Sequence, residues 1–75
     1  PFNQILNIEI NLQQREELTV EVYDLLSRRI NQLYSGSAEG MIKLQWDAND
    51  SQGNRVAPGV YVCRVNGLWK KIVLN

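Results

Sequence analysis

Oxygen-bearing side chains crowd the segment between residues 47 and 54, where their chemistry would suit a hard cation. Asp47, Asn49 and Asp50 would be the ligands, because carboxylate and amide oxygens coordinate Ca²⁺. The segment lacks the glutamate that closes a complete calcium loop. The same residue types hydrogen-bond to their own backbone in tight turns. The sequence therefore favours a polar hairpin turn over a metal site, and we expect no cofactor.

Groups that could perform catalysis are sparse, and the chain has no histidine. The carboxylates of Glu9 and Glu21 would cleave a glycoside only from the two sides of a cleft, and a domain this small leaves little room for one. Cys63 lies between apolar residues of one strand face, which predicts a buried and inert thiol. Because no nucleophile–base pair can be assembled, we expect that the protein is not an enzyme.

Length and charge narrow the class of protein. The 75 residues, 44% of them hydrophobic, suffice for one domain over residues 1–75 with one core. Eight basic residues balance eight acidic ones, and the only adjacent basic pairs are Arg28-Arg29 and Lys70-Lys71, too few for a nucleic-acid surface. No apolar run approaches the roughly 20 residues that cross a bilayer. Since the chain begins at Pro1, we expect a fragment of a longer protein.

Alternation of apolar and polar residues predicts β-strands along most of the chain. A helix competes for residues 16–34, where apolar residues also recur at spacings of three and four, but the β-branched residues of Thr19–Tyr23 favour strands. About seven short runs are separated by turn signals, which predicts an all-β sandwich or small barrel. The clearest runs cover residues 6–12, 18–23, 30–34, 41–46, 59–66 and 68–74.

Parity along these runs assigns the faces of the strands. In the last run it places Ile72 and Leu74 inward and Lys70 at the rim. Asn66-Gly67 is the strongest turn signal, because both positions tolerate the left-handed conformation of a type I′ hairpin. The other residues expected to face inward are Leu6, Ile8, Ile10, Leu12, Leu18, Val20, Val22, Ile42, Leu44, Trp46, Tyr61, Cys63 and Val65.

An ordered series of motifs gives the chain a family resemblance. The series is Pro1-Phe2-Asn3, Val22-Tyr23-Asp24, Arg28-Arg29-Ile30, Trp46-Asp47, Gly53, Pro58-Gly59-Val60-Tyr61 and Lys70-Lys71-Ile72-Val73-Leu74. It resembles the type IX secretion C-terminal sorting domain of type A. It is also similar to the related immunoglobulin-like domain of the flagellar hook-capping protein. Ser27 departs from the family, which usually has glycine at that point, so the loop after Tyr23 is expected to bend differently.

The resemblance implies both a fold and a function. It implies an immunoglobulin-like β-sandwich of about seven short antiparallel strands without catalytic activity. It also implies a secreted or cell-surface location, because sorting domains end large bacterial proteins and are read by the outer-membrane secretion and attachment machinery. The recognition residues that it implies are Gly59, Tyr61, Lys70, Lys71, Ile72 and Val73.

Two other functions fit the same residues. A structural spacer or assembly domain of a hook-capping-type or multidomain surface protein would have the same fold. A carbohydrate-binding module would stack sugars on Trp69 together with Tyr23 or Tyr34, although Trp69 would serve equally as a cross-strand packing partner. In the sorting function, we expect the last strand and the Gly59–Tyr61 turn to meet a receptor by edge-strand pairing. The same strand could also join two copies into a dimer.

Overall fold

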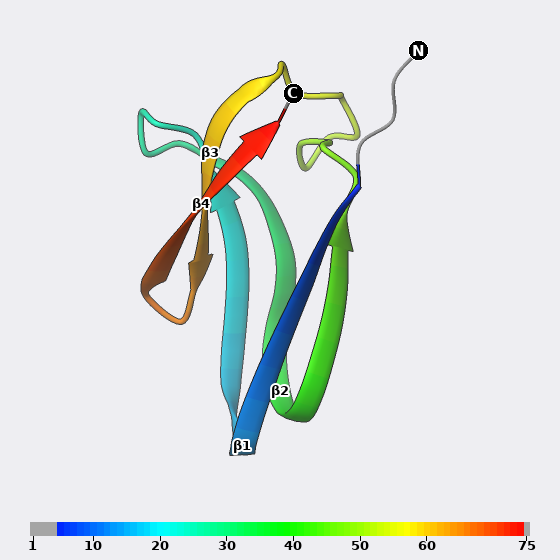
Figure 1. Ribbon diagram of the computed structural model, residues 1–75, viewed down its shortest axis with the longest axis vertical. Helices are drawn as coiled ribbons and strands as arrows, with labels where there is room; N and C mark the ends of the chain where they lie inside the picture. The colour runs from blue at the N-terminus through cyan, green and yellow to red at the C-terminus, as the bar shows by residue number, and fades with distance from the viewer. Residues whose placement is uncertain (1–4, 75) are drawn as a thin grey trace.

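The described part of the chain forms a single antiparallel sheet (Figure 1). The computed structural model describes residues 5–74, so the Pro1-Phe2-Asn3 motif lies outside the described residues. The strands are β1 (Leu6–Tyr23), β2 (Arg29–Trp46), β3 (Gly59–Val65) and β4 (Leu68–Leu74), in the order β2-β1-β3-β4. Residues 16–34 are therefore strand and hairpin, not helix. Within residues 5–74, no helix is long and apolar enough to cross a membrane.

Four long or medium strands replace the seven short ones expected from the sequence. The polar segment after Leu12 does not interrupt the ladder, because β1 and β2 stay paired from Leu6–Trp46 to Tyr23–Arg29. The runs 6–12 and 18–23 therefore merge into β1, and the runs 30–34 and 41–46 merge into β2. The polar residues of both connectors lie within the long strands, and the pairing resumes at Glu16–Ala38 after a local irregularity, which turn signals alone could not reveal.

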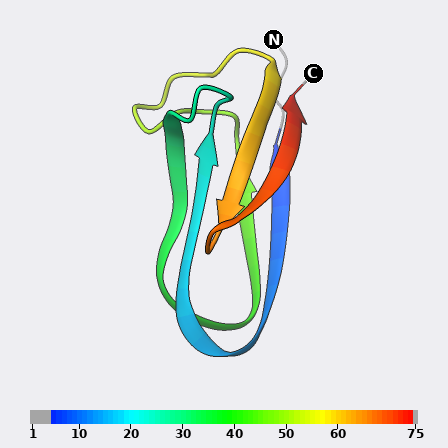
Figure 2. The same cartoon turned by 90° about the vertical axis from the view of Figure 1, so that its left-hand side faces the viewer.

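Both long strands bend sharply at the same place, as Figures 1 and 2 show at the lower end of the molecule. Gln13, Gln14 and Arg15 of β1 lie opposite Glu39 alone. Such surplus residues form a β-bulge, which bends the strand that carries it. Gly40 supplies the matching bend in β2 with φ 83°, a left-handed conformation that glycine adopts without steric cost.

The bend turns the sheet back over itself. We call Leu6–Leu12 of β1 with residues 40–46 of β2 the N-terminal arm. The remaining halves of β1 and β2, with β3 and β4, form the main sheet. The start of β1 descends and its second half ascends in Figure 2, so the arm faces the main sheet. Residues of both parts line a common space, which confirms that the inner faces oppose each other.

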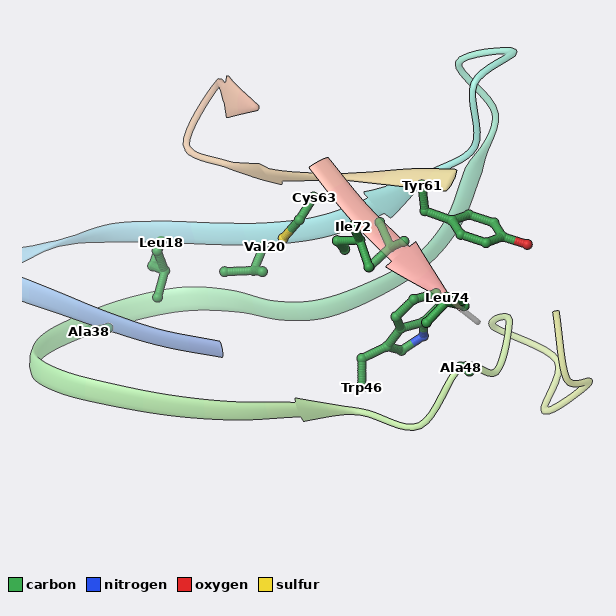
Figure 3. Packing of buried hydrophobic residues seen from close by; sticks show 10 residues of the cluster. Leu18, Val20, Ala38, Trp46, Ala48, Tyr61, Cys63, Ile72 and Leu74 are labelled. Carbon is green, nitrogen blue, oxygen red and sulfur yellow. The ribbon is translucent and has the colours of Figure 1, made fainter. Parts of the chain in front are cut away.

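The core lies between these two parts. Leu18, Val20 and Val22 are 0% exposed, and Trp46 points across the interior toward Tyr61 and Leu74 (Figure 3). The Trp46 and Tyr61 rings meet edge to face, with centroids 5.8 Å apart. The inward assignments from parity are confirmed: the buried members include Cys63, Ile72 and Leu74, and Leu6, Ile8, Ile10, Leu12, Ile42, Leu44 and Val65 pack against them while half-buried.

Tyr61 also fixes the approach to β3. Its hydroxyl donates to the carbonyl of Ala57, four residues upstream. This is the arrangement of the tyrosine corner of immunoglobulin-like domains, in which a tyrosine near the start of a strand bonds to the preceding backbone. The ring is thus held at one end by Trp46 and at the other by the chain that leads into β3.

The β3–β4 hairpin is the predicted type I′ turn. Asn66 has φ 48° and Gly67 has φ 88°, as two left-handed central residues require. Asn66 has a second role that its turn propensity does not predict. Its Oδ1 accepts from the backbone N–H of Thr19 at 2.8 Å, and its Nδ2 donates to the carbonyl of Glu17 at 3.0 Å. These bonds anchor the hairpin to β1 just past the bend.

We expect the substitution Asn66→Gly to lower the free energy of unfolding by about 1–2 kcal/mol, because glycine keeps the turn but loses both side-chain bonds. Asn66→Asp keeps the acceptor and loses the donor, so its stability should fall between the two. Urea denaturation followed by tryptophan fluorescence measures all three proteins. Equal stability of Asn66→Gly and the parent would show that the anchor contributes nothing.

Candidate recognition surface

The residues implied by the family resemblance all lie on the β3–β4 hairpin. The register places Gly59 opposite Leu74, Tyr61 opposite Ile72 and Val60 opposite Val73. The hairpin therefore brings together residues that are distant in sequence. Alternation then divides them between two faces, since neighbouring residues of a strand point to opposite sides.

Tyr61 and Ile72 belong to the core. They are 8% and 6% exposed, so a docking protein would not touch their side chains without opening the fold. The exposed members are Lys70, Lys71 and Val73, and Val73 is 51% exposed. The part of the implied set that a partner could contact is thus the side chains of β4. That these residues act in recognition stays a prediction.

The outer face of the main sheet carries a ladder of aromatic and charged side chains. Trp69 packs edge to face on Tyr23 with ring centroids 5.4 Å apart, and the guanidinium of Arg64 lies 5.2 Å from the Trp69 ring. Glu21 accepts from Tyr23 at 3.1 Å and pairs with Arg29 at 3.1 Å. The ladder crosses all four strands, and each contact is of a kind that stabilises exposed sheet faces.

This ladder is the place where a sugar could stack, because Trp69 is 53% exposed. Its packing against Tyr23 also confirms the cross-strand role that the sequence left open. Tyr34 does not join the platform, since it packs against the buried core and its hydroxyl donates to the carbonyl of Ser37. Arg64 was not singled out from the sequence; its position opposite Trp69 follows from the two-residue hairpin.

The oxygen-rich segment after Trp46 is built as a turn. Oδ1 of Asp50 accepts from the backbone N–H groups of Gln52 and Asn54, each at 2.9 Å. Oδ2 of Asp47 accepts from the side chain of Asn49 at 3.1 Å. These oxygens thus accept hydrogen bonds from groups of the loop itself. Residues 5–74 contain no group of three or more histidine, cysteine, aspartate or glutamate side chains that could hold a metal ion.

The same loop covers the start of β2. The Asn49 carbonyl accepts from the indole N–H of Trp46 at 2.8 Å and from the Asn31 side chain at 2.9 Å. The backbone N–H of Ser51 donates to the carbonyl of Ile30 at 3.0 Å. The last of these bonds occupies the Ile30 carbonyl of the edge strand β2, a backbone group of the kind that would otherwise invite pairing with another chain.

Cys63 is 4% exposed, as predicted. Burial raises the pKa of its thiol, and the nearby charge of Lys70 opposes this shift only in part. Because the thiolate is the reactive form, Cys63 is unsuited to nucleophilic chemistry at neutral pH.

The loop between β1 and β2 is hydrogen-bonded internally and exposes two leucines that sequence reasoning did not single out. Leu25 and Leu26 are 67% and 73% exposed. Oδ1 of Asp24 accepts from the backbone N–H groups of Leu26 and Arg28, each at 2.9 Å. Ser27 takes φ 66°, the left-handed conformation for which glycine is better suited. The loop therefore keeps a conformation that suits the family's usual glycine.

Comparison with known proteins identifies the family. The antiparallel sheet and the bond of Tyr61 to the chain before β3 are features of a small immunoglobulin-like domain. The family model of the FlgD Ig-like domain matches residues 3–69, so the chain belongs to this family. The flagellar hook-capping part of the resemblance is thereby confirmed. The sorting-domain part stays a prediction.

A solved structure agrees with this assignment. The crystal structure of FlgD from P. aeruginosa superposes with a TM-score of 0.63 and 26% sequence identity, over 91% of this chain. The match covers 56% of that FlgD chain, so the domain spans little more than half the length of its structural relative. No curated protein matches the chain.

The Asp24 loop should make stability depend on pH. The backbone N–H of Arg28, together with the Arg28 guanidinium at 2.8 Å and the N–H of Leu26, holds the pKa of Asp24 below its ordinary value of 3.8. A lowered folded-state pKa stabilises the fold above the ordinary value, and this stabilisation is lost as the pH falls through the lowered value. Asp24→Asn should therefore be less stable than the parent at pH 7. Urea denaturation across acidic pH should show the difference shrinking, and a pH-independent difference would contradict the assignment.

Proposed function

We propose that the chain is a non-catalytic structural or assembly domain of a larger protein of the hook-capping type. The observation that carries the proposal is the match of the FlgD Ig-like domain model to residues 3–69. We also propose that the folded sheet works as an immunoglobulin-like sandwich, with the N-terminal arm as one layer and the main sheet as the other. A stiff body of this kind suits a spacer, because its shape depends on a core and not on flexible loops.

The positions of the strand ends support a spacer or assembly role. β1 begins and β4 ends at the same end of the domain in both views (Figures 1 and 2). A parent chain that continues past both ends would therefore enter and leave together. The domain would then project from its parent, with the bend of β1 and β2 at its far end. Domains whose ends lie close together tolerate placement inside or beside other domains.

A domain exchange tests the assembly function. In P. aeruginosa FlgD, the matching Ig-like segment would be replaced by residues 1–75 of this chain, which include all of β4, and hook assembly would be followed by electron microscopy. We expect the exchanged protein to support hook assembly and a deletion of the segment to abolish it. The matched control is the exchanged protein with Val20→Asp, which places a charge at a position that is 0% exposed and should prevent folding. An exchanged protein that fails as completely as the deletion would contradict the proposal.

Type IX sorting is the second candidate, and the exposed side chains of β4 favour it. Lys70, Lys71 and Val73 make an accessible strip along the edge strand β4, with Lys71 and Val73 on one face of the strand and Lys70 on the other. An outer-membrane secretion machinery could read such a strip, with a secreted or cell-surface protein as the result. The buried positions Tyr61 and Ile72 would then act only by shaping the hairpin.

A reporter fusion tests the sorting function. Residues 1–75 fused behind a periplasmic reporter would be expressed in a bacterium with a type IX system, beside the same reporter with an established sorting domain. Export of both fusions is the expected result, and Lys70→Ser/Lys71→Ser should reduce export of this one without unfolding an exposed strip. Retention of the test fusion in the periplasm, while the established domain is exported, would exclude sorting.

A further inference from the structure

The inward side chains of this domain are buried to different extents in its two halves. In the second half of β1, the inward residues Leu18, Val20 and Val22 are 0% exposed. In the first half, the inward residues Leu6 and Ile8 remain half-buried. On β4, Leu68 shares the inward parity of Ile72 and Leu74, yet it is 74% exposed. Inward apolar side chains thus lack cover where the N-terminal arm meets β4.

The cause is a shortage of strands on one side. The N-terminal arm has only the two chain segments of β1 and β2, whereas the main sheet includes all four strands. Within the described residues, Leu6–Leu12 pairs with β2 alone, because β3 pairs with β1 only between Val20 and Tyr23. β4 is the last strand in the order and pairs with β3 alone. The open strand edges of the described residues therefore include that of Leu6–Leu12 in the arm and that of β4 in the main sheet.

A groove lies between these two edges. It has a volume of about 420 Å³, and its walls come from Leu6–Ile10 of β1 on one side and from β3 and β4 on the other. Its apolar lining includes Ile8, Leu68 and Ile72, and Lys70 stands at its rim. Residues from the first half of β1 and from β4 thus line the same groove.

We propose that this groove binds one extended strand of another protein, whose side chains alternate between apolar and acidic. The strand inserts between the free edges of β1 and β4 and completes the core that the arm leaves open. This site goes beyond the proposed function, because it follows from the geometry of the domain whichever parent protein carries it.

An extended strand matches both the backbone and the lining. Unpaired N–H and C=O groups along an edge strand recruit another strand by β-augmentation, in which pockets for alternate side chains supply specificity. Every second side chain of the guest would enter the groove, where Ile8, Leu68 and Ile72 offer apolar contact. A helix could not pair with either edge, because its backbone N–H and C=O groups are already hydrogen-bonded within the helix.

The charges at the groove select an acidic guest. Among the described residues, neither Lys70 nor Lys71 forms an ion pair. The exposed carboxylate of Glu9 is the one acidic group in the lining, and it lies opposite Lys43 across the arm. A second copy of β4 would set these lysines against their own counterparts, and like charges on paired strands destabilise the pairing. The lysines therefore disfavour a dimer and favour a guest with carboxylates.

Peptide titration of the ¹⁵N-labelled 75-residue chain tests the site. The probes are two capped peptides of seven residues, the length of β4, in which valine alternates with glutamate in one and with lysine in the other. We expect the glutamate peptide to bind and to slow amide exchange along Leu6–Leu12 and β4. The lysine peptide should bind about tenfold more weakly. Equal binding of the two peptides, or no saturable binding at about 1 mM, would overturn the proposal.

Matched variants localise the effect. Lys70→Glu/Lys71→Glu should reverse the preference, whereas Lys43→Glu, on an exposed strand position outside the groove lining, should leave it unchanged. Leu68→Ser alters an exposed side chain, so the fold should persist while binding of the glutamate peptide weakens. Two results would overturn the proposal. One is that the peptide changes amide chemical shifts only on the face around Trp69. The other is that the free chain self-associates through Leu6–Leu12 and β4.

Discussion

The structure depends on the bend that β1 and β2 make together. A sheet with one apolar face needs something to cover that face, and a chain of 75 residues has no second sheet to spare. Here the covering layer is the other half of the same two strands. The surplus residues after Leu12 and the left-handed Gly40 opposite them fold the ladder over without breaking it. Straightening the bend would expose both inner faces at once.

The rest of the molecule fixes the two parts to each other once the bend has formed. Trp46 at the end of the arm meets Tyr61 at the start of β3, and the Tyr61 hydroxyl holds the chain that leads into that strand. At the other end, Asn66 joins the β3–β4 hairpin to β1. The core is thus clamped at both ends of β3, with Leu18, Val20 and Val22 sealed between them.

The surfaces open to a partner are the strand edges and faces that this packing leaves exposed. The loop that carries Asn49 bonds to the edge of β2 at Ile30 and Asn31, while the edges of β4 and of Leu6–Leu12 in the arm stay open to a partner. The outer ladder around Trp69 and the groove beside Lys70 lie on opposite faces of the same hairpin. One hairpin thereby offers two surfaces with different chemistry.

Local patterns in the sequence determined the strand type, the inward residues and the Asn66-Gly67 turn, because these depend on neighbours in the chain and on a period of two. They also separated the buried Trp46 from the exposed Trp69, as the structure confirms. Tertiary structure alone decided that the polar connectors continue as strand, because their partners lie on the other long strand, as Ala38 does for Glu16 and Ser37 does for Glu17. It also decided that Tyr61 and Ile72 are core while Lys70 and Lys71 are accessible, and that a groove opens beside them. Such features depend on how the two halves of one sheet pack against each other, and the spacing of residues along the chain does not determine that packing.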